Sequence, residues 1–354
     1  MSNPSIVLKE KGKIVLENRP VPDLTDERSV KIAVKKTGIC GSDVHYYLHG
    51  NCGTFVVKAP MVLGHESSGV IAEVGRLVTN VKVGDKVAIE PGVPSRYSEE
   101  YKNGRYNLCP DMAFAATPPY DGTLARYYIM PEDFVYKLPD HVSLEEGALV
   151  EPLSVAVHAA KRAGIKYNSN VAVFGAGPVG LLTAGAARAL GAANVLVVDI
   201  FDTKLELAKN IGATHTYNSL KKGNFDEEII KLIGDRPDIV LEASGADIAM
   251  NNGLNLLKTG GVFVQIGMGK DDVKLPVAQM TQREIDYRGS SRYSQGDYND
   301  AVTMIANGKI DVKQLITHRF KFKDAKTAYD NIIQNGKDVV KTIIDGPEDE
   351  LAKL

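Results

Sequence analysis

Four side chains with metal-binding chemistry stand out in the first half of the sequence: Cys40, His65, Glu66 and Glu151. Thiolate, imidazole and carboxylate groups are the ligands that Zn²⁺ takes in proteins, and a catalytic zinc keeps three of them with one position open. The sequence alone does not show that these residues meet. A single cysteine is more often a small buried hydrophobe, and His65–Glu66 equally fits an ordinary surface pair, so both interpretations stay open at this point.

A glycine-rich turn in the middle of the chain is the second stretch with recognisable chemistry. It runs from Gly175 to Gly180 and follows the apolar run 171–174. In a dinucleotide-binding turn of this spacing, the first glycine permits a tight bend, the second lets the backbone approach a pyrophosphate, and the third lets a helix pack on a strand. Unpaired N–H groups at the start of the following helix then favour a phosphate. The turn therefore predicts a dinucleotide site.

A second apolar run, 194–198, ends in Asp199. A carboxylate about 20 residues after the glycine turn can accept hydrogen bonds from an adenosine ribose, which a glycine turn in another kind of α/β domain would not explain. Asp199 would also repel a 2′-phosphate, and Ile200 and Phe201 supply no cation to hold one. We therefore predict NAD as the cofactor. The expected cofactor-binding residues are Gly175, Gly177, Pro178, Val179, Gly180, Asp199, Lys204 and Ile266.

Strands and helices alternate around this turn. Helices are expected at 181–190, 202–211 and 248–257, and strands at 171–174, 194–198, 237–242 and 262–267. Such alternation is typical of a parallel, doubly wound sheet. The predicted fold class is therefore α/β, with a Rossmann-type cofactor domain at about 156–289.

The stretches on either side of this domain follow another pattern. Residues 5–89 and 124–139 read as many short strands separated by glycine turns, which is typical of a β-rich, barrel-like domain. From about 290 the chain reads as helix, strand, helix, strand and is expected to return to that domain. We therefore predict a discontinuous catalytic domain at 1–155 and 290–354.

The candidate metal ligands fall on separate elements of this first domain. Cys40 is expected in a loop at 37–45, and Glu151 in a helical stretch within 142–163 that also carries His158. Residues 91–122 are rich in Pro, Gly, Tyr and Ser and are expected to form an irregular surface lobe. The fold must therefore bring these segments together if a metal site exists.

Length and composition narrow the function classes. The 354 residues suggest two domains, and the formal net charge of −2 gives no basic bias towards nucleic acid. No run of about 18 apolar residues suggests a membrane span. Three cysteines are too few and odd in number for a disulfide framework, so we expect a reducing compartment.

The two ends of the chain bear on location. Residues 1–4 lack the basic and apolar regions of a signal peptide, so we expect a cytoplasmic protein. The final Ala352-Lys353-Leu354 resembles the Ser-Lys-Leu peroxisomal address. We favour the simpler interpretation, a frayed charged tail.

Three segments, in order and spacing, together resemble the zinc-containing medium-chain alcohol dehydrogenases. They are Gly-Ile-Cys-Gly-Ser-Asp-Val-His at 38–45, Gly-His-Glu at 64–66 and the glycine turn at 175–180. The similarity runs over nearly the whole chain. Cys-Gly-Ser-Asp-Val-His-Tyr from Cys40, Glu-Pro-Leu-Ser-Val from Glu151, and Arg292-Tyr293 further resemble the polyol branch of that family. With this resemblance, a catalytic zinc and a GroES-like catalytic domain become the expectation.

The resemblance implies a role for each chemically able residue near the metal. Cys40 and His65 would bind zinc, and Glu66 would be the third protein ligand. Glu151 would sit close, binding zinc through water or swinging in, and also reach the substrate; the two glutamates are not ranked. Ser42 and His45 match a proton relay to solvent, a task that suits a hydroxyl and an imidazole of near-neutral pKa.

The same resemblance implies the substrate class. Tyr46, Arg292 and Tyr293 match positions that contact a polyol, which needs several hydrogen-bond donors and acceptors. The expected reaction is reversible oxidation of a secondary alcohol of a sugar alcohol to a ketose with NAD. Xylitol to D-xylulose is favoured, with sorbitol or another alcohol as the alternative. A homotetramer or homodimer is implied as well. A redox-inactive nucleotide-binding relative is the alternative of another class, but it should lack the zinc ligands.

One departure from the family pattern concerns a second metal. Many members carry a structural zinc on four cysteines, spaced as positions 95, 98, 101 and 109 are here. This chain has Ser95, Ser98, Tyr101 and Cys109 at those positions. Hydroxyl groups do not replace thiolates as structural zinc ligands. We therefore predict one catalytic zinc per chain and no structural zinc.

Overall fold

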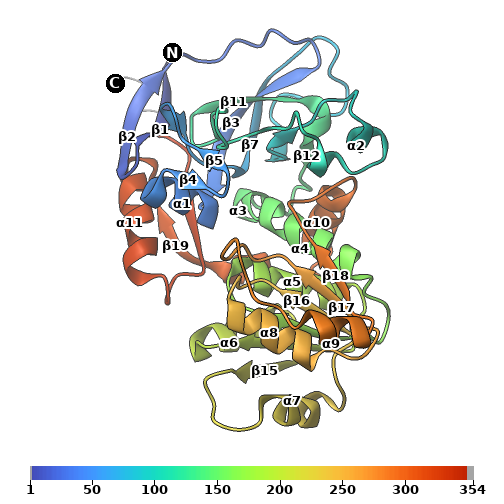
Figure 1. Cartoon of the computed structure of the whole chain (residues 1–354). Coiled ribbons are helices and arrows are strands. Elements are labelled where there is room, and N and C mark those ends of the chain that lie inside the picture. The colour runs from blue at the N-terminus through green and yellow to red at the C-terminus, as the bar shows by residue number, and fades with distance from the viewer. Residues whose placement is uncertain (1, 349–354) are drawn as a thin grey trace. The chain divides into compact units, whose positions relative to one another are not determined.

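The computed structural model describes residues 2–348, which divide into two compact units (Figure 1). Unit 1 holds the described residues up to Glu151 together with those from Ile316 onward, and unit 2 is Pro152–Leu315. The first boundary lies four residues before the expected 155/156. The second moves from the expected 290 to 316, so residues 290–315 belong to unit 2.

An ion cluster around the buried Asp297 is one of the contacts that hold residues after 290 within unit 2. Helix α10 (Asp297–Ala306) begins with Asp297, whose carboxylate contacts His158 Nδ1 at 2.8 Å and Lys161 Nζ at 2.7 Å on helix α4 (Val150–Ala163). These contacts hold the segment after 290 against the cofactor-binding unit, which the alternation of helix and strand alone did not reveal.

Unit 2 contains one six-stranded sheet in which every neighbouring pair is parallel. In spatial order its strands are β15 (His215–Asn218), β14 (Asn194–Asp199), β13 (Asn170–Phe174), β16 (Ile239–Glu242), β17 (Val262–Gln265) and β18 (Asp286–Gly289). The strand order reverses at β13, where such sheets place their ligands. The predicted doubly wound fold is confirmed.

Apolar residues on both faces explain the central position of β13, β14 and β16. All four residues of β16 and four consecutive residues in each of β13 and β14 are buried, as a parallel sheet covered on both faces requires. The connecting helices are α5 (Pro178–Ala189), α6 (Asp202–Ile211), α7 (Phe225–Ile233), α8 (Asp247–Leu256) and α9 (Val277–Gln282). The expected helices at 181–190, 202–211 and 248–257 correspond to α5, α6 and α8.

Unit 1 is built on a seven-stranded sheet. Its strands run in the order β12 (Val135–Lys137), β8 (Lys86–Ile89), β7 (Glu66–Val74), β3 (Ser29–Gly38), β20 (Lys341–Asp345) and β19 (Ile316–Phe320), and β11 (Tyr127–Pro131) also pairs with β3. A smaller sheet joins β2 (Lys13–Arg19), β1 (Asn3–Glu10) and β6 (Met61–Val62). The last two strands arrive from the C-terminal segment, so the predicted return of the chain is confirmed.

The expected loop at 37–45 is wrong in its second half, because helix α1 (Gly41–His49) begins there. Cys40 is extended at the N-cap of this helix, and its N–H donates to the Asp43 carboxylate at 3.4 Å. An acid in the first turn satisfies a free N–H group and complements the helix dipole. Gly50, at φ +76°, ends the helix in a left-handed conformation.

Residues 91–122 form the expected lobe of short elements. They are β9 (Gly92–Val93), α2 (Glu99–Lys102), a 3₁₀ turn (Tyr106–Leu108) and β10 (Ala113–Phe114). Ser98 caps α2 by accepting a hydrogen bond from the Tyr101 N–H at 3.1 Å. The buried Glu90 accepts hydrogen bonds from the hydroxyls of Tyr106 and Tyr136. Hydrogen bonds and packing therefore hold the base of this lobe.

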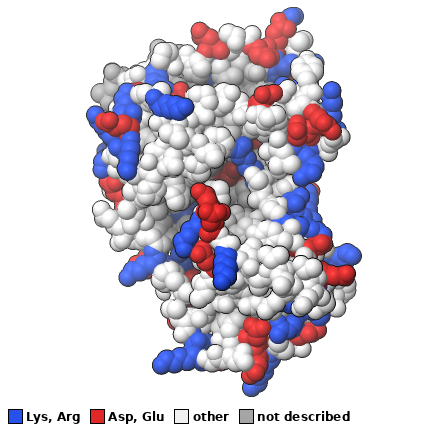
Figure 2. Space-filling model, in the orientation of Figure 1, with Lys and Arg blue, Asp and Glu red and all other residues white. Residues whose placement is uncertain are grey.

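Charged side chains of both signs are interspersed on the face shown in Figure 2, which fits the small net charge of −2. Within residues 2–348, no helix is both long enough and apolar enough to cross a membrane. The C-terminal Ala352-Lys353-Leu354, which resembles a peroxisomal address, lies outside the described residues.

Candidate active site

The structure brings Cys40, His65 and Glu66 together in unit 1. Their ligand atoms all lie within 4.8 Å of one another. Cys40 is half-buried, whereas His65 and Glu66 are only 5% and 1% exposed. One thiol, one imidazole and one carboxylate converging in a buried place match the donor set and the number of protein ligands of a catalytic zinc. The residues present therefore fit the metal that the sequence predicted.

Sheet register explains how segments distant in sequence meet here. Glu66 is the register partner of Gly38, and Gly38 is also the partner of Ile343 on β20. A Cβ atom at position 38 would lie 2.2 Å from Glu66 Oε2. Glycine is therefore required at the end of β3 so that the Glu66 carboxylate has room beside Cys40.

Asp43 is a buried residue of this centre that sequence reasoning did not assign. Its Oδ1 lies 3.6 Å from His65 Nδ1 and accepts a hydrogen bond from the Gly64 N–H at 3.3 Å. The distance to His65 is that of an ion pair and is longer than a hydrogen bond. A carboxylate in this place can orient the ring of a ligating histidine once it accepts a hydrogen bond from it. An acid three residues after a candidate ligand, in the first turn of a helix, is the signal that could have found it.

The charges around His65 act in one direction. Burial alone would lower the pKa of His65, but the negative charges of Asp43 and Cys40 outweigh burial and raise it well above its usual value. The same negative field favours a bound cation. The site is thus electrostatically suited to a metal as well as chemically suited to one.

Lys341 is the second residue that sequence reasoning missed. Its ammonium contacts both oxygens of Glu66 at 2.7 Å and donates to the Ile39 carbonyl at 3.2 Å. The side chains of Lys341 and Glu66 are 3% and 2% exposed. No local pattern around Lys341 indicates this role, because its partner is 275 positions away.

Tyr46, a predicted substrate contact, lies in the same neighbourhood. Burial raises the pKa of Tyr46 to about 12, while a hydrogen bond with the Thr117 side chain and the charge of His65 lower it. Phe114 is near as well, since its ring centroid is 5.6 Å from that of His65. The lobe at 91–122 therefore contributes to the surroundings of the metal centre.

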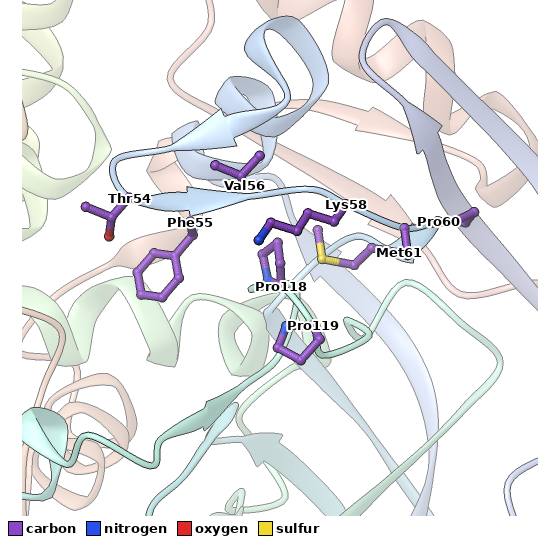
Figure 3. A pocket seen from close by; sticks show the side chains of 9 residues that line it. Thr54, Phe55, Val56, Lys58, Pro60, Met61, Pro118 and Pro119 are labelled. Atoms are coloured by element: carbon purple, nitrogen blue, oxygen red, sulfur yellow. The ribbon is translucent and has the colours of Figure 1, made fainter.

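Unit 1 also has a surface pocket, which is lined in part by Pro118 and Pro119, the two residues that follow Thr117 (Figure 3). Its other lining residues are Thr54, Phe55, Val56, Lys58, Ala59, Pro60 and Met61. Phe55 and Val56 are about half exposed on the short strand β5 (Phe55–Val56). None of the three converging ligands lines this pocket, so it is a separate feature of the surface.

The remaining residues predicted for unit 1 occupy distinct places. Ser42 is half-buried and His45 is exposed on α1, where the His45 ring lies 5.6 Å from that of His49. Glu151 is buried at the second position of α4. It is not a member of the cluster whose ligand atoms lie within 4.8 Å. The geometry therefore groups Glu66, rather than Glu151, with Cys40 and His65.

The glycine turn of unit 2 has the conformation its spacing predicts. Gly175 has φ +96°, and a Cβ at Gly180 would lie 1.8 Å from the Gly175 carbonyl oxygen. Gly177 is the N-cap of α5, with Pro178 in its first turn, followed by Val179. A Cβ on Gly177 would meet nothing within 4 Å. Open space beside the helix N-terminus is what a pyrophosphate needs.

Asp199 links the second strand to this turn. One carboxylate oxygen accepts from the Ala176 N–H at 2.6 Å, and the other from the N–H groups of Ile200 and Phe201 at 2.8 and 2.9 Å. Asp199 therefore orders the turn in addition to its predicted role at the ribose. The nearby cation is Lys204, whose ammonium lies 5.2 Å from the Phe201 ring centroid. Ile266 donates its N–H to the Glu242 carbonyl at 2.8 Å, after β17.

Arg292 and Tyr293, the other predicted substrate contacts, belong to unit 2. Arg292 has φ +53°, which is uncommon for a residue with a side chain. Tyr293 is buried and packs edge-on against Tyr298 at 4.9 Å. Asp297 accepts a hydrogen bond from the Ser294 N–H at 2.7 Å, so its ion cluster also holds this turn.

Comparisons with known proteins agree with this geometry. The model of zinc-binding dehydrogenases matches residues 178–307, and that of the alcohol dehydrogenase GroES-like domain matches residues 26–140. The chain belongs to the zinc-binding dehydrogenase family, whose members use a catalytic zinc and a nucleotide cofactor.

Individual relatives resemble the chain over nearly its whole length. It is 57% identical to sorbitol dehydrogenase 1 of Saccharomyces cerevisiae, covering 98% of this chain and 99% of that protein. It is 53% identical to a D-xylulose reductase of Scheffersomyces stipitis, with the same coverage of 98% and 99%. Among solved structures, L-idonate 5-dehydrogenase of Escherichia coli has a TM-score of 0.90 at 30% identity and covers 98% of both chains.

Proposed function

We propose that this protein is a zinc polyol dehydrogenase that reversibly oxidises a secondary alcohol of a sugar alcohol to a ketose, with NAD as acceptor. The convergence of Cys40, His65 and Glu66 in one buried place carries the proposal. The relatives named for sorbitol and D-xylulose support the substrate class. Xylitol, favoured from the sequence, and sorbitol, named in the relative of higher identity, are the two candidate substrates.

The residues of the chain divide the work of this reaction. Cys40, His65 and Glu66 would hold the zinc, and Asp43 would orient His65. The metal, when bound, supplies a Lewis acid that eases loss of the proton from an alcohol. Ser42 would receive that proton, and the exposed His45 would pass it to solvent.

Other residues would position the two reactants. The backbone N–H groups after Gly177 would bind the pyrophosphate, and Asp199 would accept hydrogen bonds from the adenosine ribose. Tyr46, Arg292 and Tyr293 would offer hydrogen-bond donors and acceptors to the hydroxyl groups of the polyol.

The finer statements about cofactors and assembly are part of this proposal. Asp199 supports NAD over NADP, because its carboxylate would repel a 2′-phosphate. Ser95, Ser98 and Tyr101 support a single zinc per chain, since they offer no thiolate. We also propose a homo-oligomer and a cytoplasmic location; the latter rests on the three cysteines, which are free in the structure.

The test combines metal analysis with NAD reduction by purified protein. Xylitol, sorbitol and ethanol would be compared before and after chelation, and NADP would be tried as the acceptor. We expect about one zinc per chain, NADH from at least one polyol, and loss of activity on chelation. Activity on ethanol alone would reject the polyol assignment. Absence of both zinc and NADH formation would reject the proposed function as a whole.

A further inference from the structure

Lys341 and Glu66 form an ion pair in the interior of unit 1. The ammonium is 2.7 Å from each carboxylate oxygen, and the two side chains are 3% and 2% exposed. Burying a charge without a partner costs several kcal/mol, so each member of this pair requires the other when no metal is present. The pair is therefore more than a surface contact.

We propose that Lys341 is a positioning residue that neutralises Glu66 in the metal-free protein and competes with the metal for it, thereby setting the zinc affinity of the centre. This inference rests on the proposed zinc site at Cys40, His65 and Glu66. It adds to that proposal a second state of Glu66, in which a lysine takes the place of the metal.

The charges around Lys341 indicate that its ammonium competes with the metal for Glu66. The ammonium faces negative charges from Glu66 on β7, Cys40 before α1 and Glu151 on α4. A divalent cation bound by Cys40 and Glu66 would itself balance these two charges. The metal and the Lys341 ammonium would nevertheless repel each other across the Glu66 carboxylate that they share, within a poorly screened interior. Removing its charge should therefore favour metal binding.

The surrounding backbone leaves Glu66 little freedom to leave its partner. Lys341 starts β20, which lies next to β3, and β3 lies next to β7, where Glu66 starts. Lys341 also donates to the Ile39 carbonyl at 3.2 Å, between Gly38 and Cys40. Contact with the ammonium and ligation of the metal therefore share one carboxylate in one fixed place.

The experiment measures zinc affinity directly, separately from catalysis. Lys341→Met keeps the length of the side chain and removes its charge, whereas Lys341→Arg keeps the charge and is the matched control. Metal-free protein of each kind would be titrated with Zn²⁺ against a competing chelator, and with Co²⁺ to follow the absorption bands of the bound metal. Thermal unfolding would be recorded with and without zinc.

We expect Lys341→Met to bind zinc about tenfold more tightly than wild type; residues behind metal ligands change affinity by this order of magnitude, and here the sign is reversed because a competing cation is removed. Its metal-free form should unfold at a lower temperature than the metal-free wild type, while its zinc-loaded form should recover most of that loss. Lys341→Arg should stay near wild type in both respects. If Lys341→Met binds zinc as tightly as wild type or more weakly, the inference is overturned, whatever the Co²⁺ absorption bands show.

A second variant and a control variant of the metal site complete the experiment. If metal-free Lys341→Met does not fold, Lys341→Gln and the rate at which a chelator removes zinc from loaded protein replace the titration, with slower removal expected. If wild type and Cys40→Ser bind zinc equally, the proposed metal site itself fails. If wild type binds zinc at this site and the Lys341 variants do not differ from it, only the present inference fails.

Discussion

The proposed metal centre of unit 1 and the proposed cofactor site at the glycine turn of unit 2 are built from different parts of the chain. The metal centre would use side chains from the β3–α1 connection and β7, and a lysine on β20 contacts one of them. The turn uses backbone N–H groups and the absence of side chains, within residues 175–199. One site depends on long-range packing and the other on local conformation.

This difference predicts how each site responds to change. A metal ligand cannot be replaced by its neighbours, because thiolate, imidazole and carboxylate each occur once in the cluster. In the turn, several backbone N–H groups would contact the cofactor together. Changing one side chain near the turn should therefore alter the preference between NAD and NADP rather than abolish cofactor binding. The predictions below follow this order of expected effect.

Replacing a metal ligand should have the largest effect. Cys40→Ser should remove most of the bound zinc and lower kcat/KM at least about a thousandfold, because the metal contributes several kcal/mol to transition-state stabilisation. Cys52→Ser is the matched control, since Cys52 is also a half-buried free thiol of unit 1 and is not in the cluster. Zinc content and polyol oxidation retained by Cys40→Ser would contradict the assignment.

Changing the residue beside the glycine turn should have an intermediate effect. Asp199→Ala combined with Ile200→Arg should shift the ratio of kcat/KM from NAD towards NADP by about ten- to a hundredfold, because arginine can bind a phosphate with two hydrogen bonds. Asp202→Ala, on the exposed start of α6, is the control. Unchanged NAD selectivity in the double variant would show that Asp199 is not the discriminating residue.

The smallest expected effect is on stability and concerns Asp297 in unit 2, whose carboxylate contacts several neighbouring groups. Burial would raise the pKa of Asp297, but hydrogen bonds from His158, Lys161 and the Ser294 N–H outweigh it and lower the pKa. A depressed carboxyl pKa stabilises the fold above the ordinary value of 3.8 and loses that contribution as the pH falls through the folded value.

Asp297→Asn should therefore be less stable than wild type at pH 7 by about 1–3 kcal/mol. The difference should shrink below about pH 4, as wild type loses the charged interaction. Urea unfolding at pH 7 and pH 3 measures both. A difference that is the same at the two pH values would show that the ionised carboxylate does not stabilise this turn.

The two sites also differ in how far the sequence predicts them. The turn, its helices and its acid are local, so the expected helix at 202–211 matches α6 (Asp202–Ile211), and Gly175, predicted to permit a tight bend, has φ +96°. The resemblance to a known family singled out Cys40, His65 and Glu66, but only the sheet register shows that they meet.

Residues that act over long distances were not predictable. Lys341 reads as an ordinary lysine until β20 is placed beside β3, and Asp43 reads as part of a loop until α1 is seen to begin at Gly41. Likewise, unit 2 extends to Leu315 rather than to the expected 289, and no local pattern shows the contacts of Asp297 that tie α10 to α4. Pattern and propensity describe neighbours in sequence, whereas these contacts depend on tertiary packing.

The most direct test of the account is anomalous X-ray diffraction from crystals of the purified protein, recorded on both sides of the zinc absorption edge. The account predicts one zinc peak per chain, in contact with Cys40 Sγ, a nitrogen of His65 and a carboxylate oxygen of Glu66. It predicts no peak near Cys109 in the 91–122 lobe. A zinc peak in the lobe would contradict the single-metal proposal, and no peak at Cys40 would contradict the central claim.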